Sequence, residues 1–193
     1  MKVLVGCEFS GIVRQAFTKR GHDAWSCDLL PTEIASKKHI QGDILEIIND
    51  EWDLIIAHPP CTHLSVSGAS RWAEKVADGR QPAAIKFVEA IWDAKNCKKL
   101  CIENPVGALS KRSKLKKPSQ YVQPFQFGHP EQKKTGLWLR GLEPLVPTKF
   151  IDVSGLPKNK VQRLHYLPPS PDRWKLRSTT YQGIADAMAS QWG

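Results

Sequence analysis

Residues 53–61, DLIIAHPPC, carry the strongest structural signal in the chain. Asp53 to Ala57 is a short apolar run, which is typical of a parallel strand that is buried on both faces. Pro59 and Pro60 end this strand abruptly, because proline has no backbone N–H group to donate to a sheet. The two rigid residues also hold the next side chain, Cys61, at a defined position. The stretch therefore predicts a buried strand with a thiol beyond its carboxyl end.

Strands and helices alternate on both sides of this stretch. Toward the N-terminus, apolar spacing predicts strands at residues 2–5 and 23–27, a helix at 11–20, a short strand or turn at 40–43 and a brief helix at 44–48. Toward the C-terminus, it predicts a helix that begins near Pro82, strands at 100–102 and 136–142, and a helix at 183–192. This alternation predicts an α/β fold, with a mostly parallel sheet and helices on both faces.

Composition limits the class of protein. The chain has 193 residues, 41% of them hydrophobic, which suffices for one core and leaves little room for a second domain. Lys and Arg number 28 against 19 Asp and Glu, and the net charge of +9 favours a polyanionic partner, usually nucleic acid, over a merely basic surface. The five cysteines and six histidines lack disulfide or metal-ligand spacing. For that reason we expect no bound metal. No secretion signal or membrane span is visible, so we expect a cytoplasmic protein.

Four of the predicted strands end in polar or reactive residues. These ends are residues 8–11 (EFSG), Asp28, residues 58–61 (HPPC) and residues 103–104 (EN). In an open α/β sheet, ligands bind beyond the carboxyl ends of the strands. The sequence therefore predicts that these four segments surround one site.

The first strand ends suit a nucleoside cofactor. Gly6 and Gly11 flank the loop from the first strand to the first helix and allow close approach of a ligand to the backbone. Asp28 can accept hydrogen bonds from both ribose hydroxyls, and Asp43 can accept one from an adenine amino group. Taken singly, Glu8 or Asp28 would more often be a helix cap or a surface charge than a ligand contact.

Cys61 and Glu103 together suit attack on a pyrimidine. Addition of a thiolate at C6 places negative charge on the ring, and a neutral carboxylic acid at N3 can neutralise it. C5 can then take a methyl group from a sulfonium. We expect burial of Glu103 at a strand end to keep its carboxyl protonated. The alternative is that Cys61 is a small buried filler, as we expect for the other four cysteines.

The motifs, in chain order, resemble those of the DNA cytosine-C5 methyltransferases, particularly short phage-type members. EFSG resembles the cofactor loop of that family, Asp28 its ribose-binding acid, and Gly42-Asp43 its adenine-side motif. DLIIAHPPCTHLSVSG resembles the Pro-Cys nucleophile motif and its mobile loop, and CIENP the Glu-Asn-Val motif. GHPEQKKTGLWLRG is similar to the family's basic strand, and YQGIADAMASQW to its last motif. Pro-Cys and Glu-Asn are the most specific of these matches.

The resemblance implies a Rossmann-like class I methyltransferase fold that uses S-adenosyl-L-methionine to modify cytosine in DNA. The DNA would be a duplex with a flipped cytosine or a single strand, in a bacterial or phage-infected cell. The implied catalytic residues are Cys61, Glu103 and Lys133. The implied cofactor-binding residues are Glu8, Phe9, Ser10, Gly11, Asp28, Leu29, Asp43, Ile44, Pro59, Gly183 and Ile184. The implied DNA contacts are Lys111, Arg112, Lys114, Lys116, Lys117 and Lys134.

The chain also departs from the family pattern. His58-Pro-Pro replaces the usual Gly-Phe-Pro, Pro105 follows Asn104 in place of Val, and Lys133 and Thr135 stand where the family has arginines. We expect residues 1–141 to form the catalytic and cofactor-binding unit, and residues 181–193 to complete it with a C-terminal helix. Residues 142–180 would form a short, basic, Pro-rich segment in place of a target-recognition domain.

Three alternatives stay open at this level. The chain can be an amino-methyltransferase, whose Asp/Asn-Pro-Pro-aromatic motif occupies the same strand end, although Glu103 is then unexplained. It can modify a free cytosine nucleotide, since residues 142–180 are short for a base-reading domain. It can also be a DNA-binding relative that kept the fold and lost catalysis. The sequence gives no oligomeric state.

Overall fold

A seven-stranded mixed sheet forms the centre of the protein in the computed structural model, which describes all of residues 1–193. The strand order is β3-β2-β1-β4-β5-β7-β6. The strands β1 to β5 are parallel to one another, whereas β7 runs antiparallel to both β5 and β6. Their bounds are β1 Lys2–Gly6, β2 Asp23–Asp28, β3 His39–Gln41, β4 Leu54–Ala57, β5 Lys99–Pro105, β6 Gln120–Val122 and β7 Thr135–Arg140.

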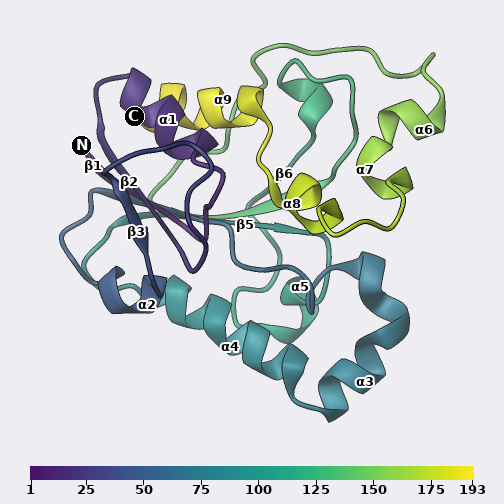
Figure 1. The fold of residues 1–193 in the computed structure, drawn as a ribbon, viewed down its shortest axis with the longest axis horizontal. Coiled ribbons are helices and arrows are strands. Elements are labelled where there is room, and N and C mark those ends of the chain that lie inside the picture. The colour runs from purple at the N-terminus through teal and green to yellow at the C-terminus, as the bar shows by residue number, and fades with distance from the viewer.

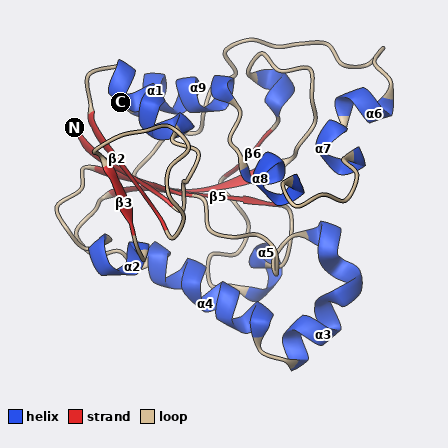
Figure 2. Cartoon of the chain, in the orientation of Figure 1, coloured by secondary structure: helices blue, strands red, loops and turns tan.

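Helices cover both faces of this sheet (Figure 1, Figure 2). The helices α1 (Ile12–Lys19) and α9 (Gln182–Trp192) lie side by side on one face. The other face carries α2 (Ile44–Ile47), α4 (Arg80–Trp92) and α5 (Leu109–Arg112). None of the helices is both long and apolar enough to cross a lipid bilayer.

The two covered faces explain why the central strands read as continuous apolar runs. Successive residues of a strand point to opposite faces, so Val3 and Val5 pack toward α1 and α9 while Leu4 packs toward α4. All three side chains are fully buried. Each face therefore has its own hydrophobic core, and the expected α/β architecture with helices on both faces is confirmed.

The strand order reverses between β1 and β4. The strand β1 pairs with β2 on one side and with β4 on the other, and Gly6 is in register with both Cys27 and Ala57. Just past this pairing, the His58 N–H donates to the Gly6 carbonyl at 2.9 Å. The loop after β1 and the loop after β4 therefore diverge from the same point, which is where doubly wound sheets bind their ligands.

Residues 142–180 contain three short helices, α6 (Lys158–Val161), α7 (Arg163–Tyr166) and α8 (Arg173–Ser178). The helix α8 spans the two diverging loops. At one end of the crossing, the Trp174 ring packs against Phe9 with 5.5 Å between centroids; at the other, an Arg177 nitrogen donates to the Ser67 hydroxyl at 3.1 Å. This segment is therefore a wall of the region beyond the strand ends.

Two elements near the same edge were not expected from the sequence. A 3-10 helix, η1 (Val66–Arg71), and the helix α3 (Trp72–Ala77) follow the segment that we expected to be a mobile loop. That segment is anchored instead: the buried Lys75 ammonium donates to the Thr62 carbonyl at 2.7 Å, and Ala108 N–H donates to the Leu64 carbonyl at 2.8 Å. Gly107 permits this contact, because a Cβ atom there would lie 1.9 Å from the Leu64 oxygen.

Candidate active site

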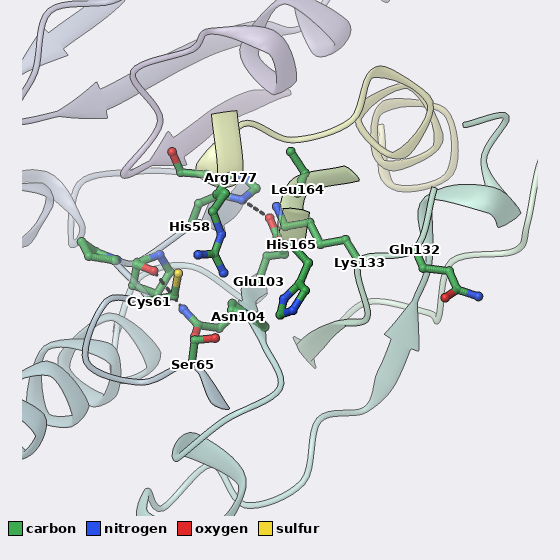
Figure 3. Close-up of a pocket in the computed structure, with 14 residues that line it drawn as sticks. His58, Cys61, Ser65, Glu103, Asn104, Gln132, Lys133, Leu164, His165 and Arg177 are labelled. Atoms are coloured by element: carbon green, nitrogen blue, oxygen red, sulfur yellow. Dashed lines mark hydrogen bonds and ion pairs between the residues drawn. The ribbon is translucent and has the colours of Figure 1, made fainter. Parts of the chain in front are cut away.

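One cavity of about 210 Å³ lies beyond the ends of β4 and β5, and both Cys61 and Glu103 line it (Figure 3). Lys133, from the segment that precedes β7, lines it as well. The three residues that we predicted to be catalytic are therefore brought together at one edge of the sheet. The cavity is also lined by His58, Pro59, Pro60, Ser65, Asn104, Pro105, Gln132, Leu164, His165, Arg177 and Ser178.

Strand pairing and two sets of hydrogen bonds position the Cys61 loop. Ala57 is in register with Ile102, so the chain leaves β4 next to Glu103. The buried Asn104 side chain donates from Nδ2 to the Pro59 carbonyl at 2.9 Å, which ties the loop to β5. The N–H groups of Leu64 and Ser65 donate to the Cys61 carbonyl at 3.0 and 2.9 Å. Both sides of the thiol-bearing residue are therefore held.

The Cys61 thiol is at the cavity wall and not in either core. Burial and the negative charge of Glu103 raise its pKa, while the positive charges of Lys133 and Arg177 act in the opposite direction without cancelling the rise. In contrast, Cys27, Cys97 and Cys101 are fully or nearly fully buried, as we expected for structural cysteines, whereas Cys7 is only partly buried. Cys61 is thus the thiol that faces two cations and a cavity.

A short buried hydrogen bond joins the ends of β4 and β5. His58 Nδ1 lies 2.5 Å from Glu103 Oε2, and both side chains are largely buried. Burial opposes both charges, but the hydrogen bond and the attraction between the partners outweigh it, so the pKa of His58 is raised and the pKa of Glu103 is lowered. Both shifts favour an imidazolium beside a carboxylate. The expectation that burial keeps Glu103 protonated is wrong for this arrangement, because His58 supplies a positive partner.

A second cavity, of about 120 Å³, lies beyond the ends of β1, β2 and β3. It is lined by Cys7, Cys27, Asp28, Leu29, Gly42, Asp43, Ile44, Pro60 and Phe87. Pro60 therefore lines both cavities and separates the thiol from this second space. The combination of two carboxylates with Leu29, Ile44 and Phe87 suits a nucleoside, because it offers acceptors for hydroxyl and amino groups beside apolar side chains.

The remaining predicted cofactor residues lie elsewhere. Glu8 is buried and caps α1, since its carboxylate accepts from Val13 N–H at 2.6 Å and from Arg14 N–H at 3.2 Å. Gly11 is the left-handed residue before α1, with φ of +73°. Phe9 and Ser10 line neither the Cys61 cavity nor the second cavity. Pro59 lines the Cys61 cavity and not the second one.

The start of α9 contacts the Cys61 side of the sheet rather than the second cavity. Gly183 N–H donates to His129 Nε2 at 2.9 Å, and a Cβ atom on Gly183 would lie 1.8 Å from the Phe127 carbonyl oxygen. Ile184 lines a small third cavity together with Glu103 and Lys133. The N-terminal end of α9 therefore lies next to Glu103 and Lys133.

The predicted DNA-contacting lysines and arginine differ in how the fold uses them. Arg112 donates to Gln81 at 2.5 Å and lies over the Trp72 ring, and Lys114 forms an ion pair with Asp93. Lys134 lies over the Tyr121 ring, with 4.4 Å from its nitrogen to the centroid. The other three, Lys111, Lys116 and Lys117, are exposed.

Several cavity residues were missed by sequence reasoning. Leu164 and His165 come from α7, Arg177 and Ser178 from α8, and Gln132 from the segment before β7. Figure 3 shows the Arg177 guanidinium pointing toward Cys61. The local sequence of residues 142–180 carries little periodicity, so nothing in it indicated that these side chains would return to the Cys61 cavity.

The strand order, the reversal between β1 and β4 and the antiparallel β7 define the Rossmann-like fold of class I methyltransferases. No protein-family model and no curated protein matches the sequence. Among solved structures 22 chains match, and one is a protein assigned as a DNA modification methyltransferase encoded within an E. coli prophage. The two chains superpose with a TM-score of 0.53 at 13% identity. The alignment covers 80% of this chain and 55% of the prophage protein, so this chain spans about half the length of its structural neighbour.

Proposed function

We propose that the protein transfers a methyl group from S-adenosyl-L-methionine to C5 of cytosine in DNA, through a covalent bond between Cys61 and C6. The observation that carries this proposal is that Cys61, Glu103 and Lys133 line one cavity beside a second cavity suited to a nucleoside. The methyltransferase fold and the DNA-modifying assignment of the prophage neighbour support it. So does the net charge of +9, which favours a polyanionic substrate.

Each half of the proposed site has a task. Asp28 would hold the ribose hydroxyls and Asp43 the adenine amino group, with Leu29, Ile44 and Phe87 against the base. When bound, this cofactor supplies an electrophilic methyl group. On the other side of Pro60, the Cys61 thiolate would add to C6 of the cytosine, and Glu103 would assist protonation of N3 of the same ring. Lys133 and Arg177 lower the cost of forming the thiolate by their positive charge.

The recognition of DNA would rest on a small surface. Residues 142–180 form a wall of the Cys61 cavity through α7 and α8, and we propose that this segment replaces a target-recognition domain. Arg177 and His165 would then contact a phosphate or the base of a cytosine that has left the stack. Lys111, Lys116 and Lys117, which are exposed, would supply further phosphate contacts.

Covalent trapping tests this function directly. A DNA oligonucleotide that contains 5-fluorocytosine should form an adduct with the wild type in the presence of cofactor, because fluorine at C5 blocks the proton loss that releases the enzyme. Cys61→Ser should form none. Cys97→Ser is the matched control, since Cys97 is buried away from both cavities and its hydrogen bond to the Lys99 carbonyl can be kept by a serine. Methylated DNA without an adduct would contradict the covalent mechanism.

A free cytosine nucleotide is the alternative substrate, and the shortness of residues 142–180 is the feature that favours it. The same reaction with dCMP distinguishes the two. Turnover of dCMP that is insensitive to salt would favour the nucleotide, whereas activity on DNA that falls steeply with salt would favour the polymer.

A further inference from the structure

His58 has no task in the reaction as described so far, although it has an unusual environment. Its imidazole is largely buried and bonds to Glu103 through Nδ1 at 2.5 Å. The other ring nitrogen, Nε2, is buried without any hydrogen-bond partner. A buried polar atom left unpaired is costly, so the fold gains no stability from this part of the side chain. The His58 ring lines the Cys61 cavity, so it combines a bond to Glu103 with a position beside the thiol.

Charged groups from three other elements face this imidazole. Glu8 acts on it from the loop after β1 and Glu103 from β5, and both favour the protonated ring. Lys133, from the segment before β7, opposes them. Two carboxylates against one ammonium leave His58 in surroundings that suit an imidazolium. Cys61, His165 and Arg177 are the other titratable groups that line the same cavity.

The proposed reaction requires a proton at the place where Glu103 lies. When the Cys61 thiolate adds to C6, electron density moves onto N3, and N3 must take up a proton for C5 to become nucleophilic. Glu103 is paired as a carboxylate, so it has no proton of its own to give. The nearest proton bonded to it is the one on His58 Nδ1.

We propose that His58 stores the proton that neutralises the pyrimidine, and that Glu103 relays it from Nδ1 to N3. The inference rests on the proposed function and extends it to a positioning residue that the family pattern lacks. As the S–C6 bond forms, the C5=C6 electrons shift to C4=C5 and the C4=N3 pair moves onto N3. Glu103 takes the proton from His58 Nδ1, whose ring becomes neutral, and passes it to N3. Once C5 carries the methyl group, loss of the C5 proton to solvent re-forms C5=C6 and expels the Cys61 thiolate. N3 then returns its proton through Glu103 to His58, so the relay consumes none.

The pH dependence of adduct formation tests the relay. His58→Asn places an amide N–H near the position of Nδ1, so the hydrogen bond to Glu103 can be kept while the transferable proton is lost. The pH optimum lies midway between the pKa of the thiol and that of the proton donor. With Glu103 as the only donor, the optimum should move to lower pH. The trapping rate at pH 8 should fall by about 10²-fold or more.

A matched histidine provides the control. His63→Asn removes an imidazole that lies two residues past Cys61 but does not line the cavity. This variant should keep the wild-type pH optimum. If His58→Asn forms the adduct more slowly but with an unshifted optimum, His58 is only a structural support and the relay is overturned. If the wild type forms no adduct at any pH, the proposed function itself fails.

A titration of the unreacted protein keeps the test independent of any variant. The proton signal of the His58 ring, followed by NMR, should titrate above the ordinary histidine value of about 6.5. The same signal should shift to lower pH in Glu103→Gln, which has no carboxylate, and should stay in place in His63→Asn. A His58 ring that loses its proton below about pH 6.5 in the wild type would overturn the relay, because no proton would be stored at neutral pH.

Discussion

The two halves of the sheet edge treat their polar residues differently. Beyond β1, β2 and β3, carboxylates mostly serve the fold: Glu8 accepts from the first N–H groups of α1, and Asp43 accepts from Leu45 N–H at the start of α2. Asp28 likewise accepts from Leu30 N–H at 2.9 Å. Beyond β4 and β5, in contrast, buried polar atoms of His58 and Asn104, which line the Cys61 cavity, lack partners.

This difference shows that a polar residue near the ligand-binding edge need not take part in the reaction. A polar residue at a strand end lies near the ligand-binding edge because of the topology alone. Whether it takes part in chemistry depends on what the fold leaves unpaired. Glu8 is fully engaged as a helix cap, whereas His58 Nε2 and Asn104 Oδ1 are buried with no partner. On this ground, we propose that the β4 and β5 side carries the reaction and that the other side holds the cofactor.

The largest expected effect is on the β5 side. Glu103→Gln keeps the size of the side chain but removes the group that we propose relays a proton. The rate of methyl transfer should fall by about 10²- to 10⁴-fold, the usual range for loss of a general acid. Cofactor affinity, measured by calorimetry, should stay close to that of the wild type. Equal losses in rate and in cofactor affinity would break the division between the two halves.

A smaller effect is expected on the β2 side. Asp28→Asn removes a charge that would accept from the ribose hydroxyls, and a hydrogen bond to a charged group contributes about 1.5–3 kcal/mol. Cofactor Kd should therefore weaken by about 10- to 100-fold. The rate of covalent trapping at saturating cofactor should be unchanged. An Asp28→Asn variant that binds cofactor normally but forms the covalent DNA adduct slowly would contradict the assignment of Asp28 to the cofactor site.

The sequence predicted the parts of this comparison that depend on local signals. Apolar runs ended by Gly6, Asp28 or Pro59 are visible without any partner, and the carboxyl ends of parallel strands meet by topology. That is why Cys61 and Glu103 could be placed at one edge in advance. The bounds of the predicted strands agree with the structure to within a few residues.

The missed features depend on contacts between distant segments. The helix α3 and the preceding 3-10 turn come after a polar stretch that gives no helical pattern. The Lys75 and Gln81 side chains hold this region by donating to the carbonyls of Thr62 and His63. Arg177 reaches the Cys61 cavity from more than 100 residues away in the chain. The pairing of His58 with Glu103 could not be inferred either, since His58 was visible only as a departure from the family pattern.

A moderate effect on DNA binding should come from α8. Arg177→Ala removes a cation of the Cys61 cavity, so affinity for DNA should fall by up to about tenfold and the salt dependence should lose about one unit of slope. Lys175→Ala is the control on the same helix, because Lys175 lies 3.7 Å from Glu33 and outside the cavity. Fluorescence anisotropy over a salt series gives both quantities. Identical slopes for the two variants would remove Arg177 from the DNA surface.

The smallest effect is on stability and concerns the His58–Glu103 pair. The lowered pKa of Glu103 contributes stability above about pH 4.3, which is lost as pH falls through the folded value. The raised pKa of His58 contributes stability below about pH 6.5, which is lost as pH rises through its folded value. In urea unfolding, Glu103→Gln should therefore cost most between about pH 4.3 and 6.5, by about 1–3 kcal/mol. A cost that does not vary with pH would contradict the ion pair.

The central claim is that one thiol at the end of β4 forms a bond to cytosine. Its most direct test is nucleoside mass analysis of DNA from cells that express the wild type, Cys61→Ser or Cys97→Ser at equal levels. We expect 5-methylcytosine above background with the wild type and with Cys97→Ser, and none with Cys61→Ser. Modified cytosine that appears equally with Cys61→Ser would contradict the account.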